Sequence, residues 1–310
     1  MNLLHSLDQL STVPGPVALA IGVFDGLHVG HQEVIRAALE HAHQHHGTAV
    51  VMSFEPHPLA VLRPGTEPKR LCGAAYRERL LERMGVTTTL LCPFDENTMA
   101  TPAGLFLDTL VRDCKPLGCI SVGYGWTFGK GRSGNIQLLM EHGAREDFSV
   151  YGVPPIRVDG EVVSSTLIRD AVAAGDLVRA SRLLGRDYAL YGGVIHGRQL
   201  ARTLNFPTAN IIPEAELLPP FGVYAVQVEI DGMKRAGIAN LGVRPTVEPG
   251  ASAPSLEVHV FDWSGDLYGQ SLEVTLRDFI RPEQKFSSVA DLQKQIEADV
   301  ALARGMLAAG

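Results

Sequence analysis

The sequence is poor in cysteine, and its few cysteines form no recognisable site. Four occur among 310 residues, all within the first 120, and no two are spaced as Cys-x-x-Cys. Neither a zinc site nor a disulfide framework is therefore indicated, and we expect reduced, mostly buried thiols. The four residues are Cys72, Cys92, Cys114 and Cys119.

Long apolar runs and an excess of positive charge are also absent. No stretch of about 18 apolar residues occurs, and the residues from Met1 to His5 show no basic segment followed by a long apolar core. We therefore expect no membrane segment and a cytoplasmic protein. The formal net charge of −7 argues against a broad nucleic-acid-binding surface. Local basic clusters could still hold phosphorylated small molecules, so a nucleotide is the better candidate partner.

The length and the apolar content predict two domains. A chain of 310 residues with 45% hydrophobic side chains allows two conventional cores at roughly 150 residues a domain. We place the domains at residues 1–185 and 186–310. In the first, apolar runs alternate with helical patterns, which predicts a parallel sheet covered by helices on both faces.

The expected elements of this first domain follow from periodicity. The predicted strands are Val17–Ile21, Ala49–Phe54, Thr87–Leu91, Ile120–Val122 and Phe148–Val153. The predicted helices lie near residues 32–45, 75–84, 101–113, 135–142 and 165–184.

The pattern changes after Gly185 to strict alternation of apolar and polar residues. Residues 226–230, 256–260 and 272–276 alternate in this way, which is typical of half-buried antiparallel strands. Together with turn signals at Gly192-Gly193, Asp231-Gly232 and Ser264-Gly265, they predict a small barrel or sandwich. Ser288 and Asp291 then resemble a capping box that opens a final helix. Its apolar stripe, expected to cover the barrel, is Val289, Leu292, Ile296, Val300 and Leu307.

The stretch from Gly22 to His31 follows the first predicted strand and opens the first predicted helix. The N–H groups that open a helix have no partners within it, and the helix dipole favours an anion there. Glycines such as Gly22 and Gly30 let the backbone approach a ligand, and His28 and His31 could both donate to one phosphate. The alternative is that the glycines only make the turn and the histidines are solvated.

Two further segments could contribute to a phosphate site. Two prolines make a rigid loop of Phe54–Pro58 that could aim His57 at the ligand of the first turn. In the segment 163–169, Ser164 or Ser165 can cap a helix, and Arg169 follows about one turn later. Taken alone, the first segment is equally explained as a structural turn, and the second is better explained as a plain helix cap beside a surface arginine.

Four histidines lie at the end of the first predicted helix, at positions 41, 43, 45 and 46. They could form a metal cluster. A solvated helix end that stops at Gly47 is the favoured explanation.

Taken in order, the histidine turn, the Phe54–Pro58 loop and the Ser164–Arg169 segment resemble the adenylyltransferase module of the bacterial bifunctional riboflavin kinase/FAD synthetases. The second half of the chain resembles the flavokinase module of the same family, with Pro-Thr-Ala-Asn as its most specific motif. The segments that carry this second resemblance are Phe206–Asn210, Gly222–Tyr224, Asn240–Thr246, Leu256–His259 and Asp266–Gly269.

The resemblance implies a Rossmann-like nucleotidyltransferase domain followed by a riboflavin kinase-like antiparallel β-barrel closed by a C-terminal helix. It also implies two consecutive reactions. ATP and Mg²⁺ would convert riboflavin to FMN, and a second ATP would convert FMN to FAD with release of pyrophosphate. We expect these small molecules as the partners and a monomer or transient homo-oligomer as the assembly.

The chemistry of the second site can be read from its residues. Thr208 and Asn210 present oxygen atoms on the same side of an extended segment, which suits Mg²⁺ holding nucleotide phosphates. Glu257 lies on the polar face of its strand and could take the proton of an attacking hydroxyl. The resemblance assigns the same roles, with Glu257 acting on the terminal ribityl hydroxyl of riboflavin.

In the first site, the FMN phosphate would attack the α-phosphorus of ATP. Catalysis would then consist of alignment and charge neutralisation by His28, His31, Ser164 and Arg169 with Mg²⁺. The nucleotide- and flavin-binding residues that we expect in the chain are Gly22, Phe24, Asp25, Gly30, His57, Ser164, Ser165, Thr166, Thr208 and Asn210.

The chain departs from the family at a few positions. Gly125 stands where the family commonly has Asn or Asp, and Ala201 and Asn205 replace common glycines. Two alternatives remain open: a riboflavin kinase whose first domain only binds nucleotide or flavin, and a nucleotidyltransferase for another phosphorylated substrate. No Walker loop is present, because Gly125–Lys130 has the wrong spacing and Gly131 follows the lysine.

Overall fold

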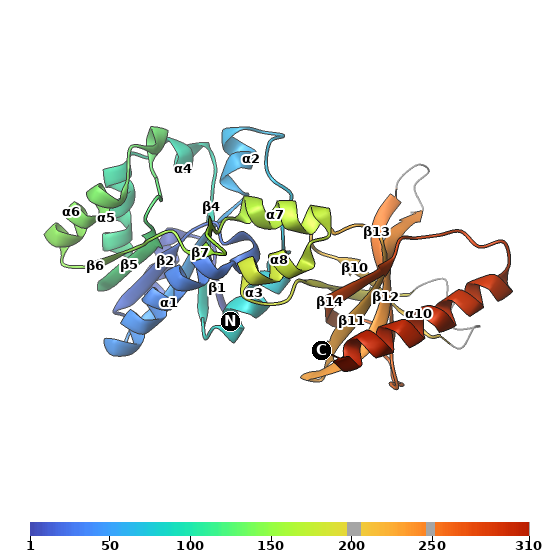
Figure 1. Cartoon of the computed structure of the whole chain (residues 1–310). Helices are drawn as coiled ribbons and strands as arrows, with labels where there is room; N and C mark the ends of the chain where they lie inside the picture. Colours follow the sequence, from blue (N-terminus) through green and yellow to red (C-terminus); the bar gives the residue numbers. More distant parts are fainter. Residues whose placement is uncertain (197–205, 246–251, 310) are drawn as a thin grey trace. The chain divides into compact units, whose positions relative to one another are not determined.

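The structure, a computed structural model, describes residues 1–196, 206–245 and 252–309 (Figure 1). It divides into two compact units, one made of Met1–Pro68 and Arg77–Ser164 and the other of Lys69–Tyr76 and Ser165–Gly310. The domain boundary after residue 185 stays a prediction. The substituted positions Ala201 and Asn205, and Thr246 of the family motif, lie outside the described residues.

The first unit contains a six-stranded sheet in the order β1-β4-β3-β2-β5-β6. Every neighbouring pair in it is parallel, which confirms the predicted parallel sheet. The strands are β1 (Asn2–Leu4), β2 (Val17–Ile21), β3 (Thr48–Glu55), β4 (Thr88–Pro93), β5 (Leu117–Gly123) and β6 (Ser149–Val153). Of the six strands of this sheet, β1 alone was not predicted, since a three-residue strand has too little pattern to recognise.

Helices cover both faces of this sheet (Figure 1). One face of β2 packs into a core with α5 (Ala103–Asp113) and the 3-10 helix η1 (Leu7–Thr12), while α1 (Val29–Gln44) packs against β2 and its neighbours without joining that core. The remaining elements are η2 (Asp25–Leu27), α2 (Pro58–Leu62), α3 (Ala74–Arg83), α4 (Glu96–Ala100), η3 (Lys130–Arg132), α6 (Ile136–Glu146), β7 (Arg157–Val158) and β8 (Glu161–Val162).

The long helix predicted over residues 165–184 is two helices, α7 (Ser165–Ala174) and α8 (Leu177–Leu184). Gly175 takes a positive φ of +78°, a backbone conformation that ends a helix. Asp176 then caps α8 by accepting a hydrogen bond from the Arg179 N–H, at 3.0 Å. The apolar periodicity runs through both helices and conceals this break.

The second unit contains a closed antiparallel barrel in the order β10-β13-β12-β11-β14-β9. The sequence allowed a barrel or a sandwich, and the structure shows the barrel. The strands are β9 (Ala189–Ile195), β10 (Ala209–Pro213), β11 (Gly222–Ile230), β12 (Met233–Pro245), β13 (Ser252–Val260) and β14 (Ser271–Arg281). Apolar residues of the predicted strands, such as Val226, Val228 and Val258, are buried.

Helix α10 (Val289–Ala309) packs against the outside of β11, β12 and β14. Val300 and Leu307 of the predicted stripe contact a small core that includes Ala303, whereas Val289 is 60% exposed and lies outside it. Ser288 accepts a hydrogen bond from the Asp291 N–H at 3.1 Å, as a helix cap would. Within the described ranges, none of the helices has the length and apolar content needed to cross a bilayer.

The expected turn at Gly192-Gly193 is wrong, because both glycines lie inside β9. Gly192 pairs with Pro213 of β10 on one side and with Leu272 of β14 on the other. A Cβ atom added at Gly192 would lie 1.9 Å from the Ile212 carbonyl oxygen. Glycine is therefore needed here for the close approach of two strands.

Replacing Gly192 by Ala should lower the free energy of unfolding by about 3 kcal/mol, because a backbone oxygen cannot move aside as a flexible side chain can. Gly193 is the matched control, since a Cβ atom there would meet nothing within 4 Å. Gly193→Ala should be neutral or slightly stabilising. Denaturant unfolding would measure the free energy of unfolding of both variants. Equal losses would contradict the need for glycine at position 192.

Candidate functional sites

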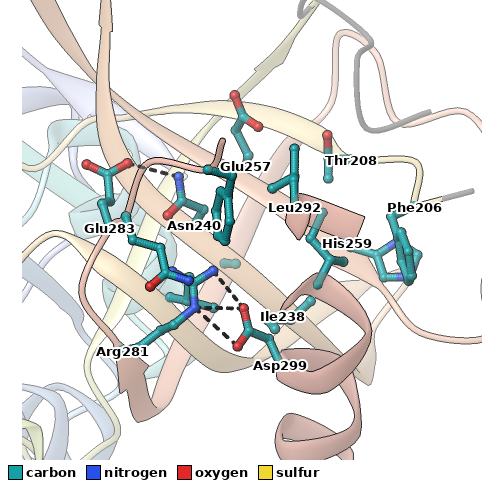
Figure 2. Close-up of a pocket in the computed structure, with 15 residues that line it drawn as sticks. Phe206, Thr208, Ile238, Asn240, Glu257, His259, Arg281, Glu283, Leu292 and Asp299 are labelled. Atoms are coloured by element: carbon teal, nitrogen blue, oxygen red, sulfur yellow. Dashed lines mark hydrogen bonds and ion pairs between the residues drawn. The ribbon is translucent and has the colours of Figure 1, made fainter. Parts of the chain in front are cut away.

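A pocket of about 280 Å³ lies between the outer face of the barrel and the region around α10 (Figure 2). On β13, the buried Leu256 and Val258 point into the barrel, so Glu257 between them points outward. The lining residues are Phe206, Thr208, Val223, Ile238, Ala239, Asn240, Glu257, His259, Arg281, Glu283, Gln284, Phe286, Leu292, Ile296 and Asp299.

The strand register brings the predicted kinase residues together. Glu257 of β13 is paired with Asn210 of β10 on one side and with Asn240 of β12 on the other. Residues paired in this way project from the same face, with Cβ atoms roughly 5 Å apart. Thr208 precedes Asn210 by two and lines the pocket with Glu257, and Figure 2 shows both side chains pointing toward the same end of it.

Asn210 has the features of a ligand-binding group. Its side chain is 6% exposed, and its Oδ1 atom has no hydrogen-bond partner among the residues that the structure describes. Leaving a buried amide oxygen unpaired is unfavourable. The position therefore favours a ligand that binds the lone pairs of this oxygen. A hard cation such as Mg²⁺ is such a ligand. The residues present therefore fit the predicted cation.

The floor of the pocket contains an ion pair that the sequence did not indicate. Arg281 of β14 contacts Asp299 of α10 through two nitrogens, with its Nε 2.9 Å and its Nη2 2.7 Å from Oδ2. Asp299 is buried. Above it, the Asn240 amide donates to the Glu283 carboxylate at 3.1 Å. These partners are far apart in the chain, so no local pattern could reveal them.

The rest of the pocket is apolar and aromatic. Phe206 and His259 lie at one side of it, with their rings at 82° to each other, and Phe286, Leu292 and Ile296 complete the lining. Apolar walls with a few polar groups are typical of sites for organic ligands. A flat conjugated ring with a polar tail suits this composition.

A second cavity of about 650 Å³ adjoins the first at Thr208, which lines both. Its walls come from the barrel interior at Val258 and Val260 and from the segment that contains Trp263, Asp266 and Tyr268. Thr208 therefore stands between two spaces. This arrangement suits two ligands that meet at the Thr208 hydroxyl.

The histidine turn lies in the first unit, at the carboxyl end of β2, between the flanking strands β3 and β5. Ligands of parallel sheets bind at this edge, where the strand order reverses direction. Helix α1 begins at Val29, three residues earlier than predicted, with His28 as its N-cap. The His28 Nδ1 accepts a hydrogen bond from the His31 N–H at 3.2 Å, so the neutral ring of His28 carries its proton on Nε2.

The structure places His28 and His31 face to face. Their rings stack with centroids 3.5 Å apart. Phe24 packs beside His31: it is 1% exposed, takes a left-handed φ of 55°, and contacts the His31 ring edge-on. A Cβ atom at Gly22 would come within 3.0 Å of the Phe24 ring, and one at Gly30 within 3.2 Å of the His28 ring. Both glycines therefore make room for the aromatic cluster.

Burial, followed by the neighbouring His28, holds the pKa of His31 well below its ordinary value of 6.5. Two stacked imidazolium cations would repel each other with little water to screen them. The His31 Nδ1 is also buried and has no partner in the described part of the chain. His31 is therefore neutral at physiological pH.

This shift predicts a pH dependence of stability. Below about pH 6.5 the unfolded chain binds a proton at His31 that the folded chain does not, so the free energy of unfolding falls as the pH is lowered. The variant His31→Gln should lose less stability than the wild type between pH 7.5 and 5. His43→Gln, at an exposed position, is the control and should follow the wild type. Chemical unfolding across this pH range measures the free energy of unfolding of each variant. The same pH dependence for His31→Gln and wild type would overturn the assignment to His31.

The other predicted residues of this site lie at helix starts. His57 caps α2, and its Nδ1 accepts from the Leu59 N–H at 3.1 Å. Ser164 directly precedes α7, which begins with Ser165 and Thr166. Arg169, one turn later, donates from Nε to the Lys69 carbonyl at 2.8 Å. We expect these residues and Asp25 to join the histidine turn around one phosphate, and this stays a prediction.

His41 does not belong to a solvated helix end, contrary to expectation. It is 5% exposed, and its Nδ1 lies 3.1 Å from the Tyr151 hydroxyl. Its ring also stacks on His45. No group of three or more His, Cys, Asp or Glu able to hold a metal occurs among the described residues.

Two family models match the chain, one in each half. The FAD synthetase model matches residues 11–167, and the riboflavin kinase model matches residues 184–307. The two matches follow each other in the order that the sequence motifs indicated.

Curated relatives match the chain along nearly its whole length. The bifunctional riboflavin kinase/FMN adenylyltransferase of Pseudomonas fluorescens is 38% identical, covering 99% of this chain and 98% of the relative. The same-named proteins of Escherichia coli K12 and Bacillus subtilis are 37% and 34% identical, covering 98% and 91% of this chain and 97% and 89% of the relatives.

A solved structure also resembles the whole chain. The crystal structure of a protein from Streptococcus pneumoniae that is named a macrolide-efflux protein superposes with a TM-score of 0.81. It is 31% identical in sequence, and the match covers 98% of this chain and 99% of that one.

Proposed function

The chain belongs to the family of bifunctional riboflavin kinase/FMN adenylyltransferases, and from this premise we propose that its two reactions use two separate sets of residues. Thr208, Asn210 and Glu257 serve the phosphorylation of riboflavin, while His28, His31, Ser164 and Arg169 serve the adenylylation of FMN. The observation that carries the first assignment is the register that pairs Glu257 with the buried Asn210, whose Oδ1 has no hydrogen-bond partner within the described ranges. The product is FAD.

In the kinase reaction, riboflavin occupies the aromatic pocket beside α10, and ATP occupies the adjoining cavity. Glu257 accepts the proton of the terminal ribityl hydroxyl, whose oxygen attacks the γ-phosphorus of ATP as ADP leaves. Thr208 fits the point where the two ligands meet because it lines both spaces.

Mg²⁺ fits the oxygens of Thr208 and Asn210. When bound there it would neutralise the phosphate charge that builds up during the transfer. The Asn210 Oδ1 is preorganised for this role, since it is buried and the described residues offer it no competing donor.

The decisive test is the set of products that purified protein forms from riboflavin, ATP and Mg²⁺. FAD as a product supports the two-reaction proposal. FMN alone would support a kinase whose first domain only binds nucleotide or flavin, and neither product would point to another phosphorylated substrate. The comparisons favour the first outcome, because each half of the chain matches the model of a different enzyme.

Glu257→Gln should lower FMN formation from riboflavin by about 10² or more, since the amide cannot accept the proton, a task worth roughly 10²–10⁴ in rate. FMN added directly should still be converted to FAD at the wild-type rate. Chromatographic separation of the flavins with each starting substrate measures both steps. An equal loss of FMN formation and of FAD formation would contradict the assignment of the two reactions to separate sets of residues.

In the adenylylation, the FMN phosphate attacks the α-phosphorus of ATP, and pyrophosphate leaves. Both partners are already charged, so the protein needs no activated nucleophile and acts by alignment and charge stabilisation. His28 presents its Nε2–H, because its Nδ1 is occupied by the cap of α1. Neutral His31 stacks against it and keeps its ring in place.

His28→Ala should reduce FMN adenylylation by about 10² or more, the usual effect of losing a transition-state donor. Riboflavin phosphorylation in the same preparation should be unchanged and serves as the internal control. Because His28 also caps α1, a loss of stability of about 1 kcal/mol is expected. The variant His28→Asn retains a capping side chain and separates the two effects: if it restores full adenylylation as well as stability, the residue is a cap and not a donor.

A further inference from the structure

Residues 69–76 lie early in the chain but belong to the barrel-containing unit. We call this segment the strap. It follows α2 and runs into the first turn of α3. Leu71, Cys72 and Tyr76 are buried at 3%, 6% and 3% exposure, so the strap is an integrated part of its unit.

Arg70 and Glu216 hold the strap by both main chain and side chain. The Arg70 N–H and Nε donate to the two carboxylate oxygens of Glu216, at 3.0 and 2.7 Å. In return, the Arg70 carbonyl accepts from the N–H groups of Glu216 and Leu217, both at 3.1 Å. A two-point contact of this kind fixes direction as well as distance.

Tyr76 anchors the other end of the strap to the barrel. Its ring stacks on Tyr191 of β9 with centroids 5.5 Å apart, and its hydroxyl donates to Glu273 of β14 at 3.2 Å. Burial, followed by the nearby Glu273 carboxylate, raises the pKa of Tyr76. The hydroxyl therefore keeps its proton and remains a donor.

The strap in turn contacts Arg169 of α7. The Lys69 carbonyl accepts from the Arg169 Nε at 2.8 Å, and Lys69 is the residue next to the fixed Arg70. A guanidinium is a rigid planar fork. Holding its Nε therefore sets the plane in which the terminal nitrogens can meet a phosphate.

We propose that Glu216 is a positioning residue for FMN adenylylation: it fixes Arg70, and thereby the Lys69 carbonyl that orients Arg169. The inference rests on the proposed role of Arg169 in that reaction. Glu216 lies within the residues that the riboflavin kinase model matches. The proposal gives it a part in FMN adenylylation, the other reaction of the enzyme.

The expected consequence is a selective loss. Glu216→Ala removes both carboxylate contacts to Arg70 and should lower kcat for FMN adenylylation about tenfold, because small misplacements of an aligning group are costly. Riboflavin phosphorylation should stay within about twofold of wild type, since Glu216 does not line either barrel cavity. The melting temperature should change little, because half-exposed ion pairs contribute little to stability.

The test uses the full chain and four comparisons. Arg70→Ala removes only the Nε contact and keeps the main-chain N–H contact, so it should reproduce part of the effect of Glu216→Ala. Glu216→Gln, which keeps one acceptor oxygen, should recover part of the rate. In the Arg169→Ala background, Glu216→Ala should have no further effect, because both changes act through one guanidinium. Asp262→Asn is the matched control: it removes the exposed pair with Arg304 at a positive φ of 52° that asparagine tolerates, and both reactions should be unchanged.

The outcomes separate this inference from its premise. If Arg169→Ala leaves adenylylation unchanged, the proposed role of Arg169 is wrong. If Arg169→Ala slows it but Glu216→Ala does not, or if their effects multiply in the double variant, the positioning role of Glu216 is overturned while the proposed function stands. An equal loss of both reactions in Glu216→Ala would also overturn it, as general damage to the fold.

Discussion

Closure of the barrel between β9 and β10 fixes which side chains face the pocket beside α10. Pairing of Asn210 with Ile195 on one side and with Glu257 on the other leaves β10 no freedom of register. A slip of one residue would turn Thr208 and Asn210 to the opposite face. The close approach at Gly192 is what permits this pairing, so the placement of Asn210 depends on a missing Cβ atom on the neighbouring strand.

The second constraint on the pocket is the buried ion pair between Arg281 and Asp299. A carboxylate removed from water must be paired, and breaking such a pair is strongly destabilising. Gln295 adds a hydrogen bond to the same carboxylate, at 2.8 Å. Because Asp299 lies on α10, the pair also holds Leu292 and Ile296 at the pocket wall. Barrel register and helix docking thus define opposite sides of one space.

The sequence predicted the features that have a local cause. Alternation of apolar and polar residues identified β11, β13 and β14, and the motif around Thr208 and Asn210 indicated oxygen atoms on one side of an extended segment. The Gly192-Gly193 pair was misread because a turn and a close strand contact favour the same residue type. Arg281 and Asp299 could not be found, because only the folding of α10 onto β14 makes them partners. Glu283 could not be found either, because its partner Asn240 lies on β12, far away in the chain.

The position of the strap in the chain gave no sign that it belongs to the barrel-containing unit. Compact units follow packing and not chain order, so residues 69–76 and the helices α7 and α8 share a unit with the barrel. Arg169, which its motif links to adenylyl transfer, makes its described Nε contact with a carbonyl that a barrel-unit carboxylate helps to fix. Under the role proposed for Arg169, the cation that stabilises the phosphate in one reaction is oriented by residues of the unit that contains the barrel. A boundary after residue 185 separates Arg70 and Arg169 from Glu216, so it would cut through this set of contacts.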